Sequence, residues 1–136
     1  MAVYGIGCNY SGEDLFEYFL NEGVACMGHR PKEYSYFTGL FKEIKDGDII
    51  FLKSLDMRKK ELKIKAIGYA KDPKFEDKGE ELGHGINVRW IKYNTSGLAK
   101  INVTSDGGWQ PRGTTIFKEY NEDIIRQIQD LVKRTI

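Results

Sequence analysis

Features that announce many common activities are scarce or missing in this sequence. Its 136 residues include two cysteines, Cys8 and Cys26, which cannot form a CxxC motif and which have apolar flanks. No histidine or carboxylate stands near them at the spacing of metal ligands. The sequence therefore predicts two buried, reduced thiols, with no disulfide, no metal and no other cofactor.

Long apolar runs and an excess of one charge are missing too. No stretch approaches the roughly 20 apolar residues that span a bilayer, and the start of the chain, residues 1–5, lacks the pattern of a signal peptide. We therefore expect a cytoplasmic protein without membrane contact. With 21 basic and 20 acidic residues the formal net charge is +1, so binding to nucleic acid would require a local cluster of Lys and Arg.

Catalytic and nucleotide-binding motifs are equally scarce. The two histidines are His29 and His84. A nucleophile–base pair of Cys26 and His29 has poor geometry, because residues three apart on a strand point to opposite faces. The run Gly5-Ile6-Gly7 starts like a dinucleotide fingerprint, but position 10 is Tyr10 and no third glycine opens a helix. These observations predict that the chain is not an enzyme.

The predicted elements follow in the order β-α-β-α, then several strands and a closing helix. Apolar residues at helical spacing predict helices over residues 12–21, 33–45 and 121–134. Ser11 and Asn121 are the expected helix caps. Apolar runs and alternation predict strands over residues 2–10, 24–27, 49–52, 62–66, 86–91, 101–103 and 114–120. The glycine-rich, charged stretch 72–85 predicts a mobile loop.

Short connections between the later strands favour antiparallel pairing, and glycines within strands favour a coiled sheet. We expect a single α+β domain over residues 1–136. Its predicted architecture is a small, coiled, mostly antiparallel β-barrel of about five or six strands, flanked by about three helices.

Two tryptophans and one strand end suggest a binding surface. Trp109 follows two glycines in a turn region, which is an unusual place for a large apolar side chain. Trp90 lies in a predicted strand, and Lys53-Ser54 ends the apolar strand 49–52 where it opens to solvent. Aromatic faces beside small and amide groups can stack a nucleobase. The alternative is that each tryptophan fills one end of the barrel.

The order of several motifs resembles the PUA-like superfamily, in particular its EVE-like and YTH-like branch and the recognition domains of modification-dependent restriction systems. The resemblance covers roughly residues 3–92. The motifs that carry it are Tyr4-Gly5-Ile6-Gly7-Cys8-Asn9-Tyr10, Val24-Ala25-Cys26-Met27-Gly28, Lys45-Asp46-Gly47-Asp48-Ile49-Ile50-Phe51-Leu52-Lys53-Ser54, Leu62-Lys63-Ile64-Lys65-Ala66-Ile67-Gly68 and Val88-Arg89-Trp90-Ile91.

The resemblance implies a concave pocket on the barrel, with an aromatic cage for a modified base taken from a duplex or a single strand. By the same resemblance, the pocket would be bordered by Asn9, Tyr10, Met27, Gly28, His29, Lys53, Ser54 and Trp90. Trp109 joins this predicted ligand site because of its place in a turn.

The predicted function is a non-catalytic module that recognises a modified or flipped-out nucleobase in DNA or RNA. Two alternatives stay open: a small-molecule or nucleotide-handling enzyme that uses the same pocket, and a protein-interaction domain that partners a nuclease or ATPase. A basic rim round an aromatic pocket would favour the nucleobase module. A buried His–Cys pair beside a cleft would favour the enzyme, and a broad apolar patch without a pocket would favour the interaction domain.

Overall fold

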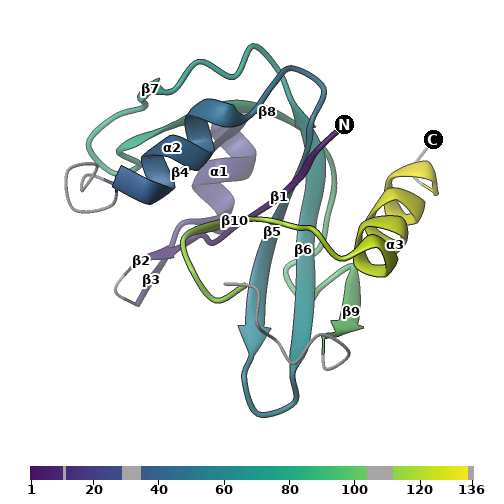
Figure 1. Cartoon of the computed structure of the whole chain (residues 1–136). Helices are drawn as coiled ribbons and strands as arrows, with labels where there is room; N and C mark the ends of the chain where they lie inside the picture. Colours follow the sequence, from purple (N-terminus) through teal and green to yellow (C-terminus); the bar gives the residue numbers. More distant parts are fainter. Residues whose placement is uncertain (11, 29–34, 104–111, 135–136) are drawn as a thin grey trace.

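The computed structural model describes residues 1–10, 12–28, 35–103 and 112–134. Figure 1 shows the arrangement of its elements. The strands are β1 (Val3–Ile6), β2 (Asn9–Tyr10), β3 (Glu13–Asp14), β4 (Val24–Cys26), β5 (Ile49–Asp56), β6 (Glu61–Ala70), β7 (Glu76–Asp77), β8 (His84–Tyr93), β9 (Ala99–Asn102) and β10 (Ile116–Lys118). The helices are α1 (Phe16–Glu22), α2 (Ser35–Glu43) and α3 (Glu122–Lys133).

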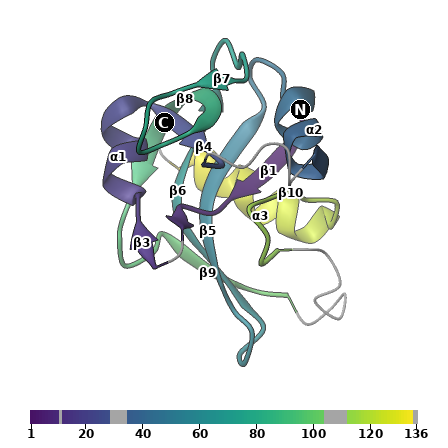
Figure 2. The same cartoon turned by 90° about the vertical axis from the view of Figure 1, so that its left-hand side faces the viewer.

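Eight strands of the described residues form one curled sheet, which resembles half of a barrel (Figure 2). Its main path is β10-β1-β5-β6-β8-β4, with β7 paired to β8 and β9 paired to β6. Strands β1 and β5 are parallel, and the other pairs in this sheet are antiparallel. The predicted α+β class and the mostly antiparallel, curled sheet are thus confirmed, although the sheet has more strands than the five or six expected.

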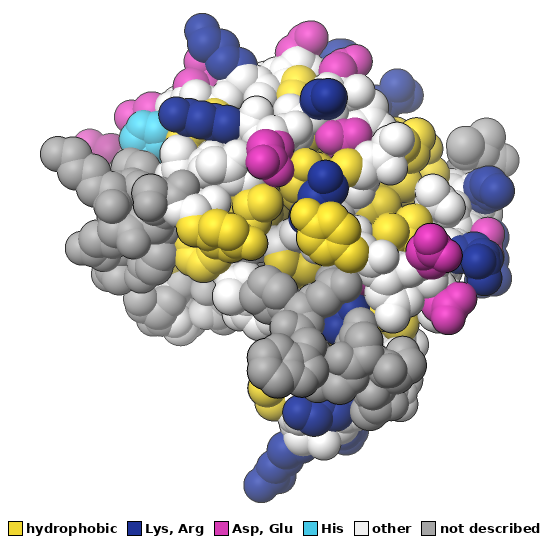
Figure 3. Space-filling view, in the orientation of Figure 1, with side chains coloured by type: hydrophobic (Ala, Val, Ile, Leu, Met, Phe, Trp, Pro, Cys, Tyr) yellow, Lys and Arg dark blue, Asp and Glu magenta, His cyan; other side chains and the backbone are white. Residues whose placement is uncertain are grey.

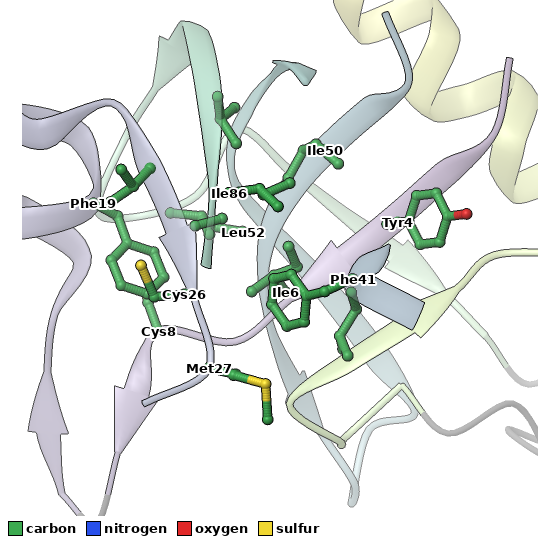
Figure 4. Close-up of a cluster of buried hydrophobic side chains, with 14 of the residues drawn as sticks. Tyr4, Ile6, Cys8, Phe19, Cys26, Met27, Phe41, Ile50, Leu52 and Ile86 are labelled. Atoms are coloured by element: carbon green, nitrogen blue, oxygen red, sulfur yellow. The ribbon is translucent and has the colours of Figure 1, made fainter. Parts of the chain in front are cut away.

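The sheet separates two hydrophobic cores. Helices α1 and α2 cover one face and α3 covers the other (Figure 1). Alternate residues of β5 supply both cores, because successive side chains of a strand point to opposite faces: Ile50 and Leu52 belong to the first, and Ile49 and Phe51 to the second. Figure 4 shows part of the first core, with Phe19, Cys26 and Ile86 among its buried side chains. Cys8 and Cys26 are both buried and free.

The start of the first helix differs from the prediction. The short strands β2 and β3 pair in antiparallel fashion, and α1 begins only at Phe16, with no side-chain cap. Asn9 Oδ1 accepts a hydrogen bond of 3.1 Å from the backbone N–H of Gly12, whose φ is 87°. A turn forms here in place of the predicted start of the helix, because Asn and Gly at these positions stabilise a tight turn. The predicted cap, Ser11, lies outside the described residues.

The other two helices match their predictions closely. The side chain of Asn121 caps α3 by accepting hydrogen bonds from the backbone N–H groups of Asp123 (3.0 Å) and Ile124 (3.2 Å).

The predicted loop over residues 72–85 contains the short strand β7. This strand was not predicted because its two charged residues show no apolar alternation. No helix in the described ranges is long and apolar enough to cross a bilayer.

Candidate functional site

A pocket of about 290 Å³ lies where β1 leaves the sheet. Ile6 pairs with Leu52 of β5 on one side and with Ile116 of β10 on the other. The backbone N–H of Gly7 still donates to Thr115 O at 2.9 Å, and the chain then turns into the β2–β3 hairpin. Strand β5 continues to Asp56, so its last residues are not paired with β1. The pocket opens there, between β5 and the segment before β10.

The lining of this pocket is mixed in polarity. It consists of Gly7, Cys8, Asn9, Tyr10, Asp14, Lys53, Ser54, Leu55, Lys65, Gly113, Thr114 and Thr115. Its volume is close to the lower limit of about 300 Å³ that is usual for small-molecule pockets. The space therefore suits a ligand with the dimensions of one nucleobase or a similar small ring.

Lys53 is a buried lysine whose amine lines the pocket. The side chain is 7% exposed, and its Nζ donates a hydrogen bond to the backbone carbonyl of Thr114. Nζ also lies 5.6 Å from the centroid of the Phe117 ring. Burial lowers the pKa of Lys53 from 10.5 to about 8, and the nearby Cys8 opposes this change in part.

Lys65 enters the pocket through an irregularity in the sheet. Leu52 pairs with Ala66, but the next residue, Lys53, pairs with Ile64, so Lys65 is an extra residue in β6. Such a bulge redirects a side chain that regular alternation would place elsewhere. Regular alternation in the predicted strand over residues 62–66 would place Lys65 on the face opposite to the apolar residues, whereas its side chain is only 15% exposed.

Asp14 connects Lys65 to Cys8. Its Oδ2 lies 3.9 Å from Lys65 Nζ, and its Oδ1 lies 3.6 Å from Cys8 Sγ. Oδ1 also accepts the backbone N–H of Phe16 at 3.0 Å, which holds the carboxylate at the start of α1. Burial raises the pKa of Cys8 to about 11, so the thiol is protonated at neutral pH and is a poor nucleophile.

Tyr10 is the aromatic member of this lining. Its ring is half-buried and lies 6.2 Å from the Phe19 ring centroid. The hydroxyl donates to the backbone carbonyl of Cys26. A Cβ on Gly28 would stand 3.8 Å from the ring, so the segment after β4 lies beside Tyr10. These contacts fix the ring beside the pocket.

The structure brings together four of the predicted site residues, Asn9, Tyr10, Lys53 and Ser54, in one pocket. Gly28 lies beside Tyr10, and Met27 is buried in the first core with its Sδ 3.7 Å from Thr38 Oγ1. His29 and Trp109 lie outside the described residues.

Trp90 is placed elsewhere. Its indole N–H donates to the backbone carbonyls of Phe19 (3.0 Å) and Val24 (3.2 Å), and its half-buried ring packs against the first core. Trp90 thus ties β8 to α1 and β4, and it is not among the residues that line the pocket.

Several lining residues were not included in the predicted site. Asp14 falls in the predicted helix over residues 12–21, and residues 114–115 fall in the predicted strand over 114–120. Lys65 falls in the predicted strand over residues 62–66. These residues come together because β1 ends at Ile6 and because β6 contains a bulge. No local sequence pattern predicts either feature.

A second hollow, of about 510 Å³, adjoins the pocket and shares Ser54 and Leu55 with it. It lies along the hairpin of β5 and β6, and its charged lining residues are Asp56, Arg58, Lys59, Glu61, Lys63 and Lys100. We call residues 56–63 together with Lys100 the basic hairpin. Its turn is held by Asp56 Oδ1, which accepts the backbone N–H groups of Arg58 (3.0 Å) and Lys59 (3.1 Å). Figure 3 shows Lys and Arg side chains at this end of the molecule.

Comparison with known proteins does not assign the chain to a family. No family model matches the chain, and a search of curated proteins finds no match. Within the described ranges, no group of three or more His, Cys, Asp and Glu side chains is arranged to hold a metal ion. The pocket and the basic hairpin beside it are therefore the features that bear on function.

Proposed function

We propose that this chain is a non-catalytic module that binds a modified or flipped-out nucleobase of DNA or RNA in the pocket between β1 and β5. The observation that carries the proposal is the meeting of Asn9, Tyr10, Lys53 and Ser54 in one small pocket that opens beside the basic hairpin. The pocket has the volume for one base, and the basic residues proposed to bind phosphate lie directly beside it.

The polar groups of the pocket suit the edge of a base. Base carbonyl oxygens and ring nitrogens accept hydrogen bonds, and Lys65, Ser54 and the amide nitrogen of Asn9 can donate them. The carboxylate of Asp14 can accept from an exocyclic amino group. The ring of Tyr10 supplies an aromatic surface, and stacking of this kind is worth about 1–3 kcal/mol per base.

The basic hairpin supplies a place for the flanking phosphates. Four of its residues that line the hollow are basic, Arg58, Lys59, Lys63 and Lys100, against the two acids Asp56 and Glu61. The whole chain carries a formal net charge of only +1, so this local excess is the clustered charge that phosphate binding requires.

A PUA-like, EVE-like fold and a cytoplasmic location are part of the same proposal. The curled, mostly antiparallel sheet with its helices supports the fold assignment, and two free, buried cysteines fit a reducing compartment. A module without catalytic activity further implies a separate partner, a nuclease or an ATPase, that acts on the bound nucleic acid.

The experiment is a fluorescence anisotropy titration with short single-stranded and double-stranded oligonucleotides, each with an unmodified base, 5-methylcytosine or N6-methyladenine at one position. We expect one modified oligonucleotide to bind more tightly than its unmodified counterpart. Asn9→Ala should weaken that binding about 5-fold, the value of one neutral hydrogen bond.

Asn94→Ala is the matched control for this variant. Asn94 Oδ1 accepts a backbone N–H from Ser96 at 2.9 Å, as Asn9 Oδ1 does from Gly12, but Asn94 is not among the residues that line the pocket. Both variants lose a similar turn contact, so only a ligand contact should separate them. Equal, negligible binding of every oligonucleotide by the wild-type protein would remove the proposed function.

A further inference from the structure

We propose that Lys53 captures its ligand covalently, by forming a reversible imine with an aldehyde group on a nucleobase-sized ring. The proposal rests on the proposed function for the carrier of the aldehyde, a formyl-bearing base in nucleic acid. The capacity of the amine to react rests on the burial of Lys53 and on its place in the pocket, whatever carries the aldehyde.

The surroundings of the Lys53 amine set it apart from the other lysines of the described ranges. Lys53 is the buried lysine of these ranges. No carboxylate of the described residues forms an ion pair with it. Its polar contact is the backbone carbonyl of Thr114. By contrast, Lys65 faces Asp14, and Lys78 Nζ is shared between Glu76 (3.2 Å) and Asn87 (2.8 Å).

Reaction requires the neutral amine, since an ammonium has no lone pair to donate. Buried lysines without a counter-ion are the ones that serve in imine chemistry, because removal of water disfavours their charged form. With its pKa lowered to about 8, Lys53 is about half neutral at pH 8. An exposed lysine of ordinary pKa is neutral on the order of 100-fold less often at that pH.

The chemical step balances without an oxidant or a reductant. The nitrogen lone pair of Lys53 attacks the aldehyde carbon, the carbonyl oxygen takes up a proton, and the nitrogen loses one, which gives a carbinolamine. The hydroxyl then leaves as water after a second protonation, while nitrogen loses its remaining proton and the C=N bond forms. Lys65, which lines the same pocket, is a proton donor for the departing water, and hydrolysis reverses the step.

The volume of the pocket restricts the aldehyde. About 290 Å³ accommodates a single substituted ring, and the polar lining suits a ring with carbonyl groups. A 5-formylpyrimidine combines such a ring with an aldehyde. Its carbonyl oxygens can accept hydrogen bonds from Ser54 and Asn9, while the formyl carbon meets Lys53.

The test uses the full chain at pH 8 with 5-formyl-2′-deoxyuridine, and in parallel with a single-stranded oligonucleotide that carries the same base. Sodium cyanoborohydride reduces any imine to a stable secondary amine, and peptide mass mapping locates it. We expect one adduct, on Lys53, that forms at least about 10-fold faster than adducts at other lysines and whose rate rises with pH around a midpoint near 8. Lys53→Arg should lose this adduct, whereas Lys42→Arg, an exposed lysine on α2, should keep it.

The two probes separate the imine from the proposed function. Adducts spread evenly over exposed lysines, or tight binding of the formyl oligonucleotide in an anisotropy titration with no adduct on Lys53, would overturn the imine; the second result would leave the nucleobase module standing. An adduct with the nucleoside and none with the oligonucleotide would support the imine and count against nucleic acid as the carrier. Mapping on the wild-type protein decides the matter even where Lys53→Arg fails to fold.

Discussion

Arg112 and Glu119 form a buried ion pair with two parallel hydrogen bonds, Nε to Oε1 at 2.9 Å and Nη2 to Oε2 at 3.0 Å. The two side chains are 1% and 0% exposed. Glu119 Oε2 also accepts the backbone N–H of Asn121 at 3.1 Å, where α3 begins. The segment between the pair includes residues 113–115, which line the pocket. The pair therefore fixes one wall of the candidate site.

Removal of Glu119 should destabilise the protein strongly. Glu119→Ala leaves the Arg112 guanidinium buried without its carboxylate, and the expected loss is about 3–5 kcal/mol in the free energy of unfolding. Urea unfolding followed by fluorescence measures it. The control is Asp123→Ala, which removes an exposed ion pair to Arg126 and should cost less than about 1 kcal/mol. Similar losses for both variants would contradict a structural role for the buried pair.

Trp90 should matter for stability and not for binding. Trp90→Ala removes a half-buried ring and two indole hydrogen bonds, and we expect a loss of about 2–4 kcal/mol in the free energy of unfolding. Trp90→Phe keeps most of the packing and should lose about 1 kcal/mol. Both are measured by urea unfolding, together with the Kd of the folded fraction for an oligonucleotide. A fully folded Trp90→Phe protein that no longer binds would place this ring in the ligand site instead.

Lys53 should give the stability a distinct dependence on pH. Its pKa falls from 10.5 in the unfolded chain to about 8 in the fold, so between these values the unfolded chain holds a proton that the folded protein has released. The free energy of unfolding therefore rises with pH in this window. Relative to Lys53→Met, the wild type should gain about 1 kcal/mol between pH 7 and pH 9.

Cys8 acts in the opposite direction on wild type and on Lys53→Met alike, so its effect largely cancels in this difference. Its pKa rises from 9.0 to about 11 on folding, so the unfolded thiol loses its proton first and the contribution of Cys8 to the free energy of unfolding falls with pH above 9. Urea unfolding at pH 7, 8 and 9 checks the prediction for Lys53. A constant difference between wild type and Lys53→Met over this range would show that the amine is not desolvated.

The basic hairpin should carry the salt-sensitive part of binding. Arg58→Gln with Lys59→Gln removes two of the proposed phosphate contacts, so the slope of log K against log salt should become shallower by about 1–2. The control is Lys133→Gln with Arg134→Gln, which removes the same charge from the end of α3. Anisotropy titrations between 50 mM and 200 mM salt measure both. Equal weakening by the two double variants would mean that net charge acts and the hairpin does not.

The sequence predicted the elements whose signals are local. Helices α2 and α3 follow from apolar spacing and from the cap at Asn121. The sequence also predicts Lys53-Ser54 at a site because the pair follows an apolar strand, and the structure places both in the pocket lining. The features that the sequence did not predict depend on contacts between segments far apart in the chain. The bulge that turns Lys65 inward exists only in the register of β5 with β6, and the direction of the Trp90 indole depends on carbonyls of α1 and β4. Neither is encoded in a neighbouring residue type.

The central claim, that the pocket beside β1 and β5 holds a nucleobase, is tested most directly by chemical-shift mapping on ¹⁵N-labelled protein. A saturating modified nucleoside should shift the backbone amides of Asn9, Tyr10, Ser54 and Thr115, and an oligonucleotide should shift these and the amides of Arg58 and Lys59 as well. Shifts confined to other faces of the molecule, or no shift with either ligand, would contradict the account.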